Sequence, residues 1–291
     1  MSGSWIKFSD MKLIAERYGL DVSRPSVMAI VNVTPDSFYA ASRTFDEAAV
    51  VERVRRAVEE GCSVVDVGGC SSRPGADDVP LDEEIRRVEL GIRCVRQVSK
   101  SVPVSVDTFR SEVVAMAVAA DERIIVNDIS AGEFDPRMIA VVAEADVPYI
   151  AMHMRGRPST MSQLTDYGDV VSDVVGSLLR RVDRLVEGGI RCGNILLDPG
   201  FGFAKTVEQN YELLAGVDKL CELGFPIVAG VSRKSMIYKV LETVPDECLA
   251  GTAALHWELL RRGVSVLRVH DTRAAVDVVK LYEKFKSVND K

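Results

Sequence analysis

Residues 27–33 read VMAIVNV, and Thr34-Pro35-Asp36-Ser37 follow them directly. A short run that is apolar almost throughout, and rich in β-branched residues, is typical of a strand in a parallel sheet whose faces are both covered. An open dinucleotide-binding sheet would continue from such a strand into a G-x-G-x-x-G turn. Residues 34–37 contain no glycine. The stretch therefore predicts a buried parallel strand and argues against a dinucleotide-binding fold.

Seven similar runs follow along the chain, at residues 63–67, 102–106, 123–127, 147–152, 194–197, 225–231 and 264–269. Segments with helical periodicity separate them, and Thr44 with Glu47 matches a capping box at the start of the first helix. Eight strand and helix repeats in about 260 residues favour a (β/α)₈ TIM barrel over the alternative, an open doubly wound sheet. We expect residues 1–25 to form an N-terminal lead-in or a cover for the barrel bottom, and residues 26–291 to form a single barrel domain.

Composition excludes several classes of protein. Apolar residues make up 47% of the chain and charged residues 27%, which is typical of a globular protein and not of a disordered one. The net charge of −7 predicts no general binding of nucleic acid, because an acidic surface repels a phosphate backbone. No run of about 18 apolar residues predicts a membrane span, and residues 1–10 lack a signal-peptide core. We expect a cytoplasmic protein whose six scattered cysteines are mostly small buried hydrophobic residues.

Polar residues end almost every predicted strand. In a barrel of this kind the carboxyl ends of the strands form the active-site mouth, so these side chains are expected to converge. A single Asp or Asn after a strand often caps a helix or makes a turn, but such a series of them indicates a binding site. In chain order they are Asn32, Asp66, Asp107, Asn127, Asp128, His153, Asp198, Ser232, Arg268 and His270.

Two carboxylates and one amide, Asp107, Asn127 and Asp198, lie where burial is expected. A buried carboxylate must be paired or hydrogen-bonded, and a ligand can supply the donors. A planar heterocycle with an amino group and ring N–H groups matches such a set. Lys234, in the run Ser232-Arg233-Lys234-Ser235, follows a strand and is expected to point at the same ligand; the alternative is a surface lysine.

A second, cationic group predicts an anion site. Arg268 and His270 lie on the same side of one strand, and Arg73 lies in the loop after strand two. Arginine offers a planar fork to phosphate oxygens, and barrels often bind phosphate near the last strands. For His270 alone, a core or capping role is the alternative. Asn32 is placed to contact a Mg²⁺ ion that keeps most of its waters.

Other motifs carry less weight. Gly200-Phe201-Gly202 is a lone G-x-G, which indicates a tight loop, with Phe201 or Phe203 able to stack on a ligand. His153 is expected to pack or hydrogen-bond inside the barrel mouth. The three histidines show no zinc-ligand spacing, so no zinc is predicted, and no G-x-S-x-G elbow indicates a serine hydrolase.

Taken in order, these segments resemble the dihydropteroate synthase family of (β/α)₈ barrel enzymes, nearly from end to end. The resemblance rests on runs that are long and specific. They are Asn32-Val33-Thr34-Pro35-Asp36-Ser37-Phe38, Asp66-Val67-Gly68-Gly69, Ser72-Arg73-Pro74-Gly75, Ser105-Val106-Asp107-Thr108, Asn127-Asp128-Ile129, Met152-His153-Met154, Asp198-Pro199-Gly200-Phe201-Gly202-Phe203, Gly230-Val231-Ser232-Arg233-Lys234-Ser235 and Arg268-Val269-His270-Asp271.

The resemblance implies condensation of hydroxymethyl-dihydropterin pyrophosphate with para-aminobenzoate, by a sulfonamide-targeted enzyme that forms a homodimer. Because the sequence shows no fused kinase or aldolase segment, we expect the enzyme to be monofunctional. It implies that Asp107, Asn127, Asp198 and Lys234 hold the pterin, with Met152 against the ring. Pyrophosphate and Mg²⁺ are assigned to Arg268, His270, Ser72 and Asn32. The border of para-aminobenzoate is assigned to Arg73, Pro74, Phe203, Lys234 and Ser235. Asp107, Lys234 and Arg268 are expected to be catalytic, with Asp107 stabilising a pterin cation.

Two loops depart from the family pattern. Cys70 stands where the family has Glu, and residues 39–43 replace a Ser-Asp-Gly-Gly run, so the first loop is expected to close differently. We predict that Cys70 is dispensable. Two alternative functions stay open: the pterin-binding domain of corrinoid-linked methyltransferases, which has no need for the pyrophosphate-directed cations, and a catalytically silent folate-binding paralogue.

Overall fold

The apolar runs form strands and the periodic segments between them form helices in a computed structural model, which describes residues 18–34, 47–70 and 79–289. Five of the eight strands are buried along their whole length, and the other three have a single partly exposed residue each, as expected for strands with helices outside and side chains inside. The strands are β1 (Ser26–Asn32), β2 (Val64–Gly68), β3 (Val104–Asp107), β4 (Ile124–Asp128), β5 (Tyr149–Met152), β6 (Ile195–Asp198), β7 (Val228–Ala229) and β8 (Val266–Val269).

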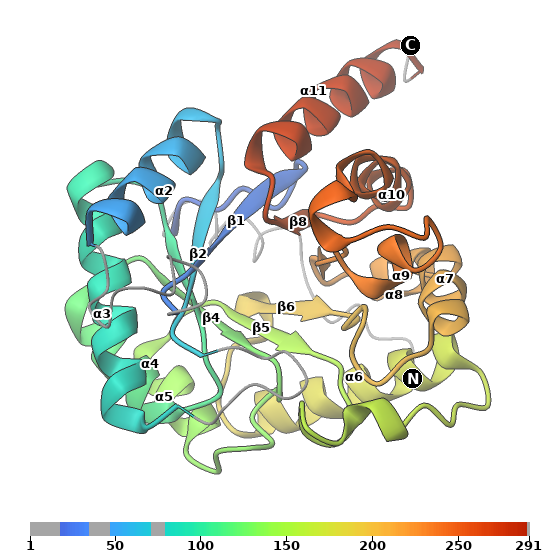
Figure 1. Cartoon of the computed structure of the whole chain (residues 1–291). Helices are drawn as coiled ribbons and strands as arrows, with labels where there is room; N and C mark the ends of the chain where they lie inside the picture. Colours follow the sequence, from blue (N-terminus) through green and yellow to red (C-terminus); the bar gives the residue numbers. More distant parts are fainter. Residues whose placement is uncertain (1–17, 35–46, 71–78, 290–291) are drawn as a thin grey trace.

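All strand pairs are parallel, and the sheet runs in the order β6-β5-β4-β3-β2-β1-β8-β7. A parallel bridge between Leu197 and Ile227 links the two outer strands of this order, so the sheet returns on itself. Figure 1 shows the strands around the centre with helices outside them. The predicted (β/α)₈ barrel is confirmed, and the alternative of an open doubly wound sheet is wrong.

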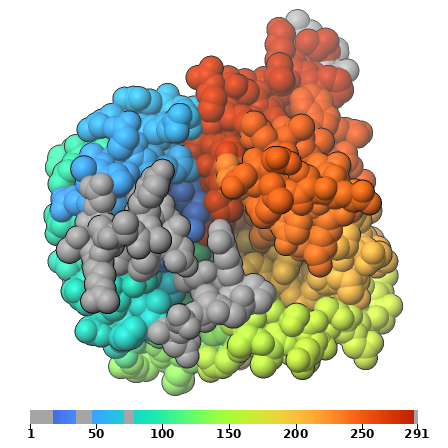
Figure 2. Space-filling model, viewed as in Figure 1, coloured from blue at the N-terminus to red at the C-terminus, as the bar shows by residue number. Residues whose placement is uncertain are grey.

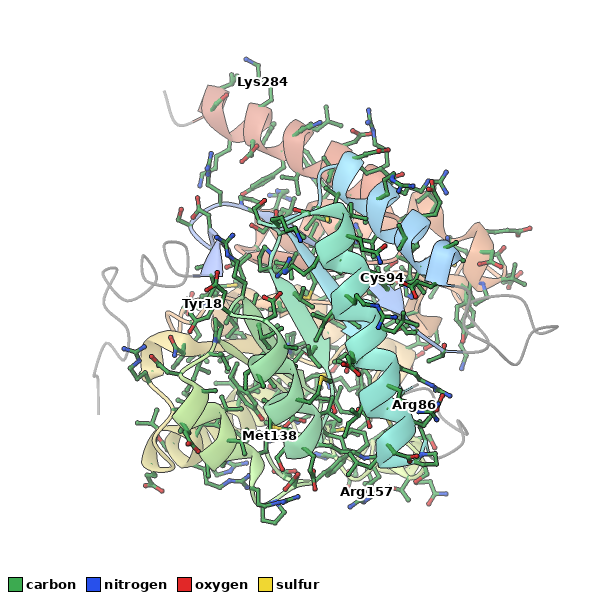
Figure 3. The ribbon with its side chains drawn as sticks, turned by 90° about the vertical axis from the view of Figure 1, so that its left-hand side faces the viewer. Tyr18, Arg86, Cys94, Met138, Arg157 and Lys284 are labelled. Carbon is green, nitrogen blue, oxygen red and sulfur yellow. The ribbon has the colours of Figure 1, made fainter. Side chains whose placement is uncertain are left out.

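The helices cover the outside of the sheet with their apolar faces. They are α2 (Glu47–Glu59), α3 (Leu81–Val98), α4 (Ser111–Ala120), α5 (Met138–Ala145), α6 (Val170–Glu187), α7 (Val207–Ala215), α8 (Asp218–Cys221), α9 (Ser235–Tyr238), α10 (Leu249–Arg261) and α11 (Thr272–Asn289), with 3₁₀ turns at Met161–Gln163, Cys192–Asn194 and Pro245–Glu247. Figure 3 views this layer from outside, with Cys94 on α3 and Met138 at the start of α5. No helix in the described ranges is both long enough and apolar enough to cross a membrane.

Helix starts follow local rules where the structure describes them. Thr206 and Gln209 form a capping box at the start of α7, and Asp169 caps α6 by accepting from the Ser172 amide at 2.7 Å. Helix α2 begins at Glu47. The predicted cap Thr44 lies outside the described residues.

The core has two layers. Outside the sheet, a large apolar cluster joins strands to helices. Inside, the lower part of the barrel is filled by one apolar layer, to which Leu20 and Val22 of the lead-in contribute. Leu20 is fully buried, so the described part of the lead-in closes the barrel bottom. The opposite end, at the carboxyl ends of the strands, is where barrels of this kind bind their ligands.

Strand register brings the strand ends to one level. Asn32 pairs with Gly68, Gly68 with Asp107, and Asp107 with Asn127, so four neighbouring strands end side by side. On the other side of the ring Met152 pairs with Asp198. Because side chains alternate along a strand, residues in register project to the same side of the sheet. The upper barrel thus presents a ring of polar groups.

Candidate functional site

An arginine occupies the centre of the barrel mouth. Arg268 on β8 places Nη2 at 2.6 Å from Asp107 Oδ2 on β3, and its Nε lies 2.7 Å from Asp66 Oδ2 on β2. Asp66 is fully buried, whereas the side chains of Asp107 and Arg268 keep 14% and 20% of their exposure. Burial opposes the charge on Arg268, but the two carboxylates outweigh it and raise its pKa. The guanidinium is therefore permanently charged and directed at the mouth.

Asn127 and Asp198 complete the acceptor ring. Asn127 on β4 is buried, and its Nδ2 lies 3.4 Å from Asp66 Oδ1. Asp198 on β6 is also buried and accepts from the Gly200 amide at 2.7 Å. Burial raises the pKa of Asp107 and of Asp198, while Arg268 and Lys234 respectively act to lower them. Carboxylates in this state gain stability from any ligand that donates hydrogen bonds.

Lys234 enters from the loop after β7. It directly precedes α9, and its Nζ donates to the carbonyl of Phe201 and lies 4.8 Å from the centre of the Phe203 ring. Burial lowers the pKa of Lys234 to about 8, against the favourable charge of Asp198. Ser235 is the first residue of α9. The surface-lysine interpretation of Lys234 is wrong, because this amine faces the barrel mouth.

The end of β8 is tied to the loop after β7. The His270 amide donates to Ser232 Oγ at 3.2 Å, and the same oxygen lies 3.1 Å from His270 Nδ1. Arg233 has a left-handed φ of 56° and forms a two-pronged ion pair with Asp271 at 2.7 and 3.0 Å. Arg53 donates to the His270 carbonyl at 2.6 Å. These bonds hold the cationic side of the mouth in one arrangement.

Asn32 is the last residue of β1, is partly buried, and lies beside Gly68 of β2. A Cβ atom on Gly68 would lie 3.0 Å from Asn32 Oδ1, so glycine at that position leaves the amide oxygen accessible. The described residues contain no group of three His, Cys, Asp or Glu side chains able to hold a metal. A Mg²⁺ ion here would accordingly take one amide oxygen from the described chain and its other ligands from waters and substrate oxygens, which is the usual pattern for this ion.

An apolar wall faces these polar groups. Ile129, Met152, Met154, Met161 and Ala204 form one buried cluster, and three partly exposed aromatic rings pack on it, those of Phe109, Phe134 and Phe203. Met152 ends β5, and its carbonyl accepts from the buried Arg181 of α6. Such a wall offers an apolar surface of the kind on which a flat heterocycle packs.

Most of the residues predicted from the sequence do come together. Those the structure brings to the mouth are Asn32, Asp107, Asn127, Met152, Asp198, Phe203, Lys234, Arg268 and His270. Ser235 follows Lys234 as the first residue of α9. The three predicted residues of the second loop, Ser72, Arg73 and Pro74, lie outside the described residues, as do residues 39–43 of the first loop.

Cys70 lies at the edge of the second loop. Burial, then the charge of Glu84 and a hydrogen bond to it, raises the pKa of the thiol above its usual range. Glu84 is itself fully buried and accepts from Thr108 Oγ1 at 2.6 Å and Arg110 Nη1 at 2.7 Å. The thiol therefore stays protonated as one donor to a structural carboxylate.

Three polar residues of the site were not singled out as site residues from the sequence. Asp66 was identified only as a strand end, although it is the buried partner of Arg268. Lys205 and Arg181 are buried beneath the loops after β6 and β5, where they donate to backbone carbonyls. The helical pattern around Arg181 does not distinguish it from an exposed arginine. Lys205 does not directly follow a strand, so the rule that strand ends form the site did not select it. His153 is buried and contacts Lys205, as its predicted role in packing or hydrogen bonding requires.

Comparison with known proteins agrees with this geometry. Residues 28–270 match the model of the family described as pterin binding enzyme. The chain is 40% identical to the dihydropteroate synthase of Synechocystis over 259 residues, covering 89% of each protein, and 36% identical to that of Escherichia coli over 280 residues, covering 96% of this chain and 98% of the relative.

Solved structures are similar in fold. The Xanthomonas albilineans dihydropteroate synthase with 4-aminobenzoic acid superposes with a TM-score of 0.85 at 40% identity, covering 91% of this chain and 94% of that one. The same enzyme in complex with 7,8-dihydropteroate gives a TM-score of 0.82 at 39% identity, covering 92% and 95%. This identity extends over nearly the whole length of both partners and includes the barrel that carries the site. The chain therefore belongs to the pterin-binding enzyme family, and within it to the dihydropteroate synthases.

Proposed function

We propose that this chain condenses hydroxymethyl-dihydropterin pyrophosphate with para-aminobenzoate, giving dihydropteroate and pyrophosphate for folate biosynthesis. The observation that carries the proposal is the convergence of two opposed sets of groups in one mouth. Asp107, Asn127 and Asp198 match the donors of a pterin, and Arg268 matches a leaving anion beside them. Met152 supports the flat face of the ring.

The reaction breaks the bond from the pterin methylene carbon to oxygen, and the electron pair leaves with pyrophosphate. Arg268 and His270 stabilise the charge that develops on the leaving group. Asp107 lies 2.6 Å from Arg268 and faces the pterin, so it stabilises the cation that remains. The amine nitrogen of para-aminobenzoate then bonds to the methylene carbon and loses one proton to solvent. No covalent bond to the protein is required.

Asn32 would hold a Mg²⁺ ion, which when bound supplies further charge neutralisation to the pyrophosphate. Ser72 is assigned to the same pyrophosphate. Arg73, Pro74, Phe203, Lys234 and Ser235 are assigned to the border of para-aminobenzoate, in keeping with the contact between Lys234 and the Phe203 ring. Isothermal titration of Mg²⁺ in the presence of pyrophosphate, with Asn32→Ala beside the wild type, tests the assignment to Asn32.

Pyrophosphate release tests the function directly. Purified protein is given hydroxymethyl-dihydropterin pyrophosphate and Mg²⁺, with and without para-aminobenzoate. Release that depends on para-aminobenzoate and yields dihydropteroate supports the proposal. Tight pterin binding without release would identify a silent folate-binding paralogue or a methyl-transfer module instead, and would overturn the pyrophosphate-site assignments.

We further propose that the enzyme is a homodimer joined through its last helices. Leu281, Phe285 and Val288 keep 65%, 51% and 61% of their exposure and recur at four- and three-residue steps, so they share one face of α11. Figure 2 shows the end of α11 projecting beyond the rest of the visible surface. Leu281→Glu is expected to shift the mass measured by light scattering from dimer to monomer, whereas Lys219→Glu on α8 is expected to leave it unchanged.

A cytoplasmic location is the last part of the proposal. All six cysteines are present as free thiols, and Cys94 and Cys248 are buried, which suits a reducing compartment. Cell fractionation with an antibody to the protein tests it, and recovery of the protein outside the cytoplasmic fraction would contradict it.

A further inference from the structure

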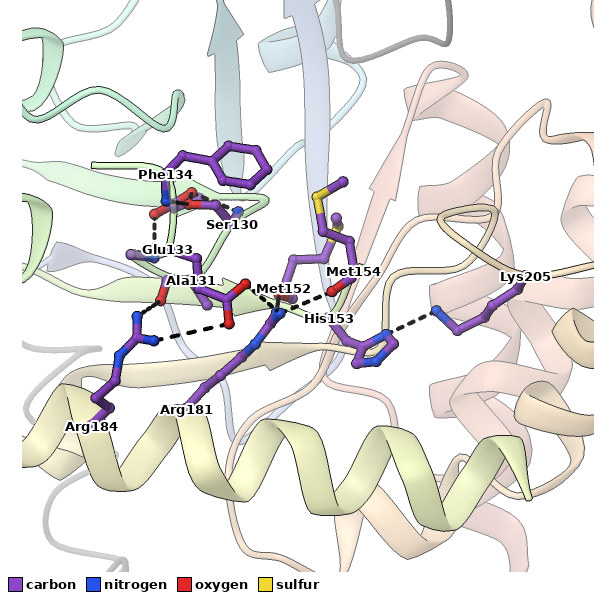
Figure 4. A network of polar contacts seen from close by, with 12 residues as sticks. Ser130, Ala131, Glu133, Phe134, Met152, His153, Met154, Arg181, Arg184 and Lys205 are labelled. Atoms are coloured by element: carbon purple, nitrogen blue, oxygen red, sulfur yellow. Dashed lines mark hydrogen bonds and ion pairs between the residues drawn. The ribbon is translucent and has the colours of Figure 1, made fainter. Parts of the chain in front are cut away.

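A buried lysine lies beside the substrate mouth and is not used in the reaction above. Lys205 follows β6 by seven residues and keeps 9% of its exposure. Its Nζ lies 2.9 Å from the Gly200 carbonyl oxygen and 3.0 Å from the Phe203 carbonyl oxygen. It also lies 3.1 Å from His153 Nδ1 (Figure 4). An ammonium group has three N–H donors, so each donor has one acceptor. The site is built for the charged form of the side chain.

The two carbonyls belong to the loop that presents substrate groups. Gly200 donates its amide to Asp198, and the Phe203 amide donates to the Gly200 carbonyl at 3.1 Å. Lys205 thus fixes both ends of the short turn from Gly200 to Phe203. This turn lies between Asp198, which is assigned to the pterin, and the Phe203 ring. A shift of this turn would move the ring relative to Asp198.

The third acceptor belongs to the neighbouring strand. His153 directly follows Met152, and its amide donates to the Asp198 carbonyl at 2.8 Å. Arg181 holds the same segment, because it donates to the carbonyls of Met152 and Met154 (Figure 4). Burial lowers the pKa of His153 strongly, so the ring is neutral and its Nδ1 can accept. Lys205 therefore links the end of β5 to the loop after β6.

The link is costly for the fold. Among the residues that the structure describes, Lys205 forms no ion pair, and a buried ammonium without a counter-charge is unfavourable. Burial lowers the pKa of Lys205 to about 7. Of the charged groups around it, Asp198 favours the charged form, whereas Lys234, Arg155 and Arg181 oppose it. A methionine would fill the same space without this cost, so the three hydrogen bonds need a purpose beyond packing.

We propose that Lys205 is a positioning residue that joins the two substrate subsites, holding Phe203 at the para-aminobenzoate side in fixed relation to Met152 at the pterin side. The proposal rests on the function proposed above, which assigns those two sides. It predicts that loss of the ammonium group weakens para-aminobenzoate binding more than pterin binding. Met152, at the pterin side, is still held by the hydrogen bond from Arg181 to its carbonyl.

Steady-state kinetics of Lys205→Met, Lys205→Arg and the exposed control Lys219→Met test the proposal. We expect Lys205→Met to raise KM for para-aminobenzoate by about tenfold, the effect of losing a hydrogen bond from a charged donor. KM for the pterin substrate is expected to change by less than about threefold, and Lys205→Arg to restore most of the loss. Lys219→Met should match the wild type. Equal increases in both KM values, or none, would overturn the proposal.

The pH dependence gives a second readout that does not require the methionine variant to fold. The amine loses its proton as pH rises through about 7, and a neutral amine has only two donors for three acceptors. KM for para-aminobenzoate should therefore rise between about pH 6 and about pH 7.5 in the wild type, below the pH at which Lys234 loses its charge, and stay level over that range in Lys205→Arg. If that rise persists in Lys205→Arg, the role proposed for Lys205 is overturned, while the proposed function of the enzyme is not affected. A wild type without turnover would overturn the proposed function, and this role with it.

Discussion

Arg268 and Asp107 meet at 2.6 Å in the middle of the barrel mouth, although 161 residues separate them in the chain. The pair joins the group expected to stabilise the leaving anion to the group expected to stabilise the cation left behind. Each charge is thus compensated before substrate binds. The site can therefore hold both charges in a partly dehydrated setting without reorganising during the reaction.

Replacing Asp107 by asparagine tests the electrostatic role of its carboxylate. Asp107→Asn removes the charge and keeps the shape, so we expect kcat to fall by about 10²- to 10³-fold. Single-turnover measurement of dihydropteroate formation checks this, with Asp183→Asn on the exposed side of α6 as the control. A near wild-type turnover number in Asp107→Asn would show that the carboxylate does not stabilise the cation.

Removing Arg268 should destabilise the fold as well as the site. Arg268→Met leaves Asp66 fully buried without its partner, at an expected cost of about 3 kcal/mol in the free energy of unfolding. The second change Asp66→Asn should recover part of that loss. The control is Arg93→Met, which breaks an exposed pair with Glu47 and should cost less than about 1 kcal/mol. Urea denaturation measures all four proteins; equal losses in the two arginine variants would contradict the prediction.

Deprotonation of Lys234 should make kcat/KM fall at alkaline pH. Its pKa is lowered to about 8, so the amine is charged below that pH and loses its charge as pH rises through it. We expect kcat/KM to decline above about pH 8, and the decline to move to higher pH in Lys234→Arg, because a guanidinium stays charged. A pH profile from 6 to 10 measures this. If the decline of kcat/KM occurs at the same pH in the arginine variant, a group other than Lys234 causes it.

Gly200 is required by a close approach of two loops. Its φ is 67°, and a Cβ atom there would lie 1.9 Å from the His153 carbonyl oxygen. Gly224 also has a positive φ, of 85°, but a Cβ there would meet nothing within 4 Å. Gly224→Ala should therefore cost only backbone strain of about 1 kcal/mol, and Gly200→Ala clearly more. Comparable unfolding midpoints for the two variants would refute the steric argument.

Cys70 should be dispensable for turnover. Its thiol pKa is raised by burial and by Glu84, so little thiolate is available at neutral pH. We expect Cys70→Ala to retain wild-type kcat within about threefold, since it loses one weak donor to a carboxylate that keeps two others. Wild-type protein should react slowly with iodoacetamide at this position by mass spectrometry. A large activity loss in Cys70→Ala would indicate a direct role in the second loop.

Much of the site was predictable because, in a barrel, the place of a residue around the mouth follows from which strand it ends. Asp107 and Asn127 end consecutive strands, and parallel register must then bring them level. Lys234 was predictable for the same reason, since it lies just after a strand. Lys205 was not, because nothing in the local sequence distinguishes a lysine folded back beneath its own loop from an exposed one.

The sequence by itself determined the class of fold, the succession of strands and helices along the chain, and the polar groups that end the strands. These depend on local periodicity and on the rule that parallel strands end at one rim. Only the tertiary structure decided the partners: that Arg268 pairs with Asp66 across 202 residues, and that Lys205 joins His153 to Gly200. Such contacts depend on closure of the ring, which places β8 beside β1, and on side-chain directions that burial and charge balance select together.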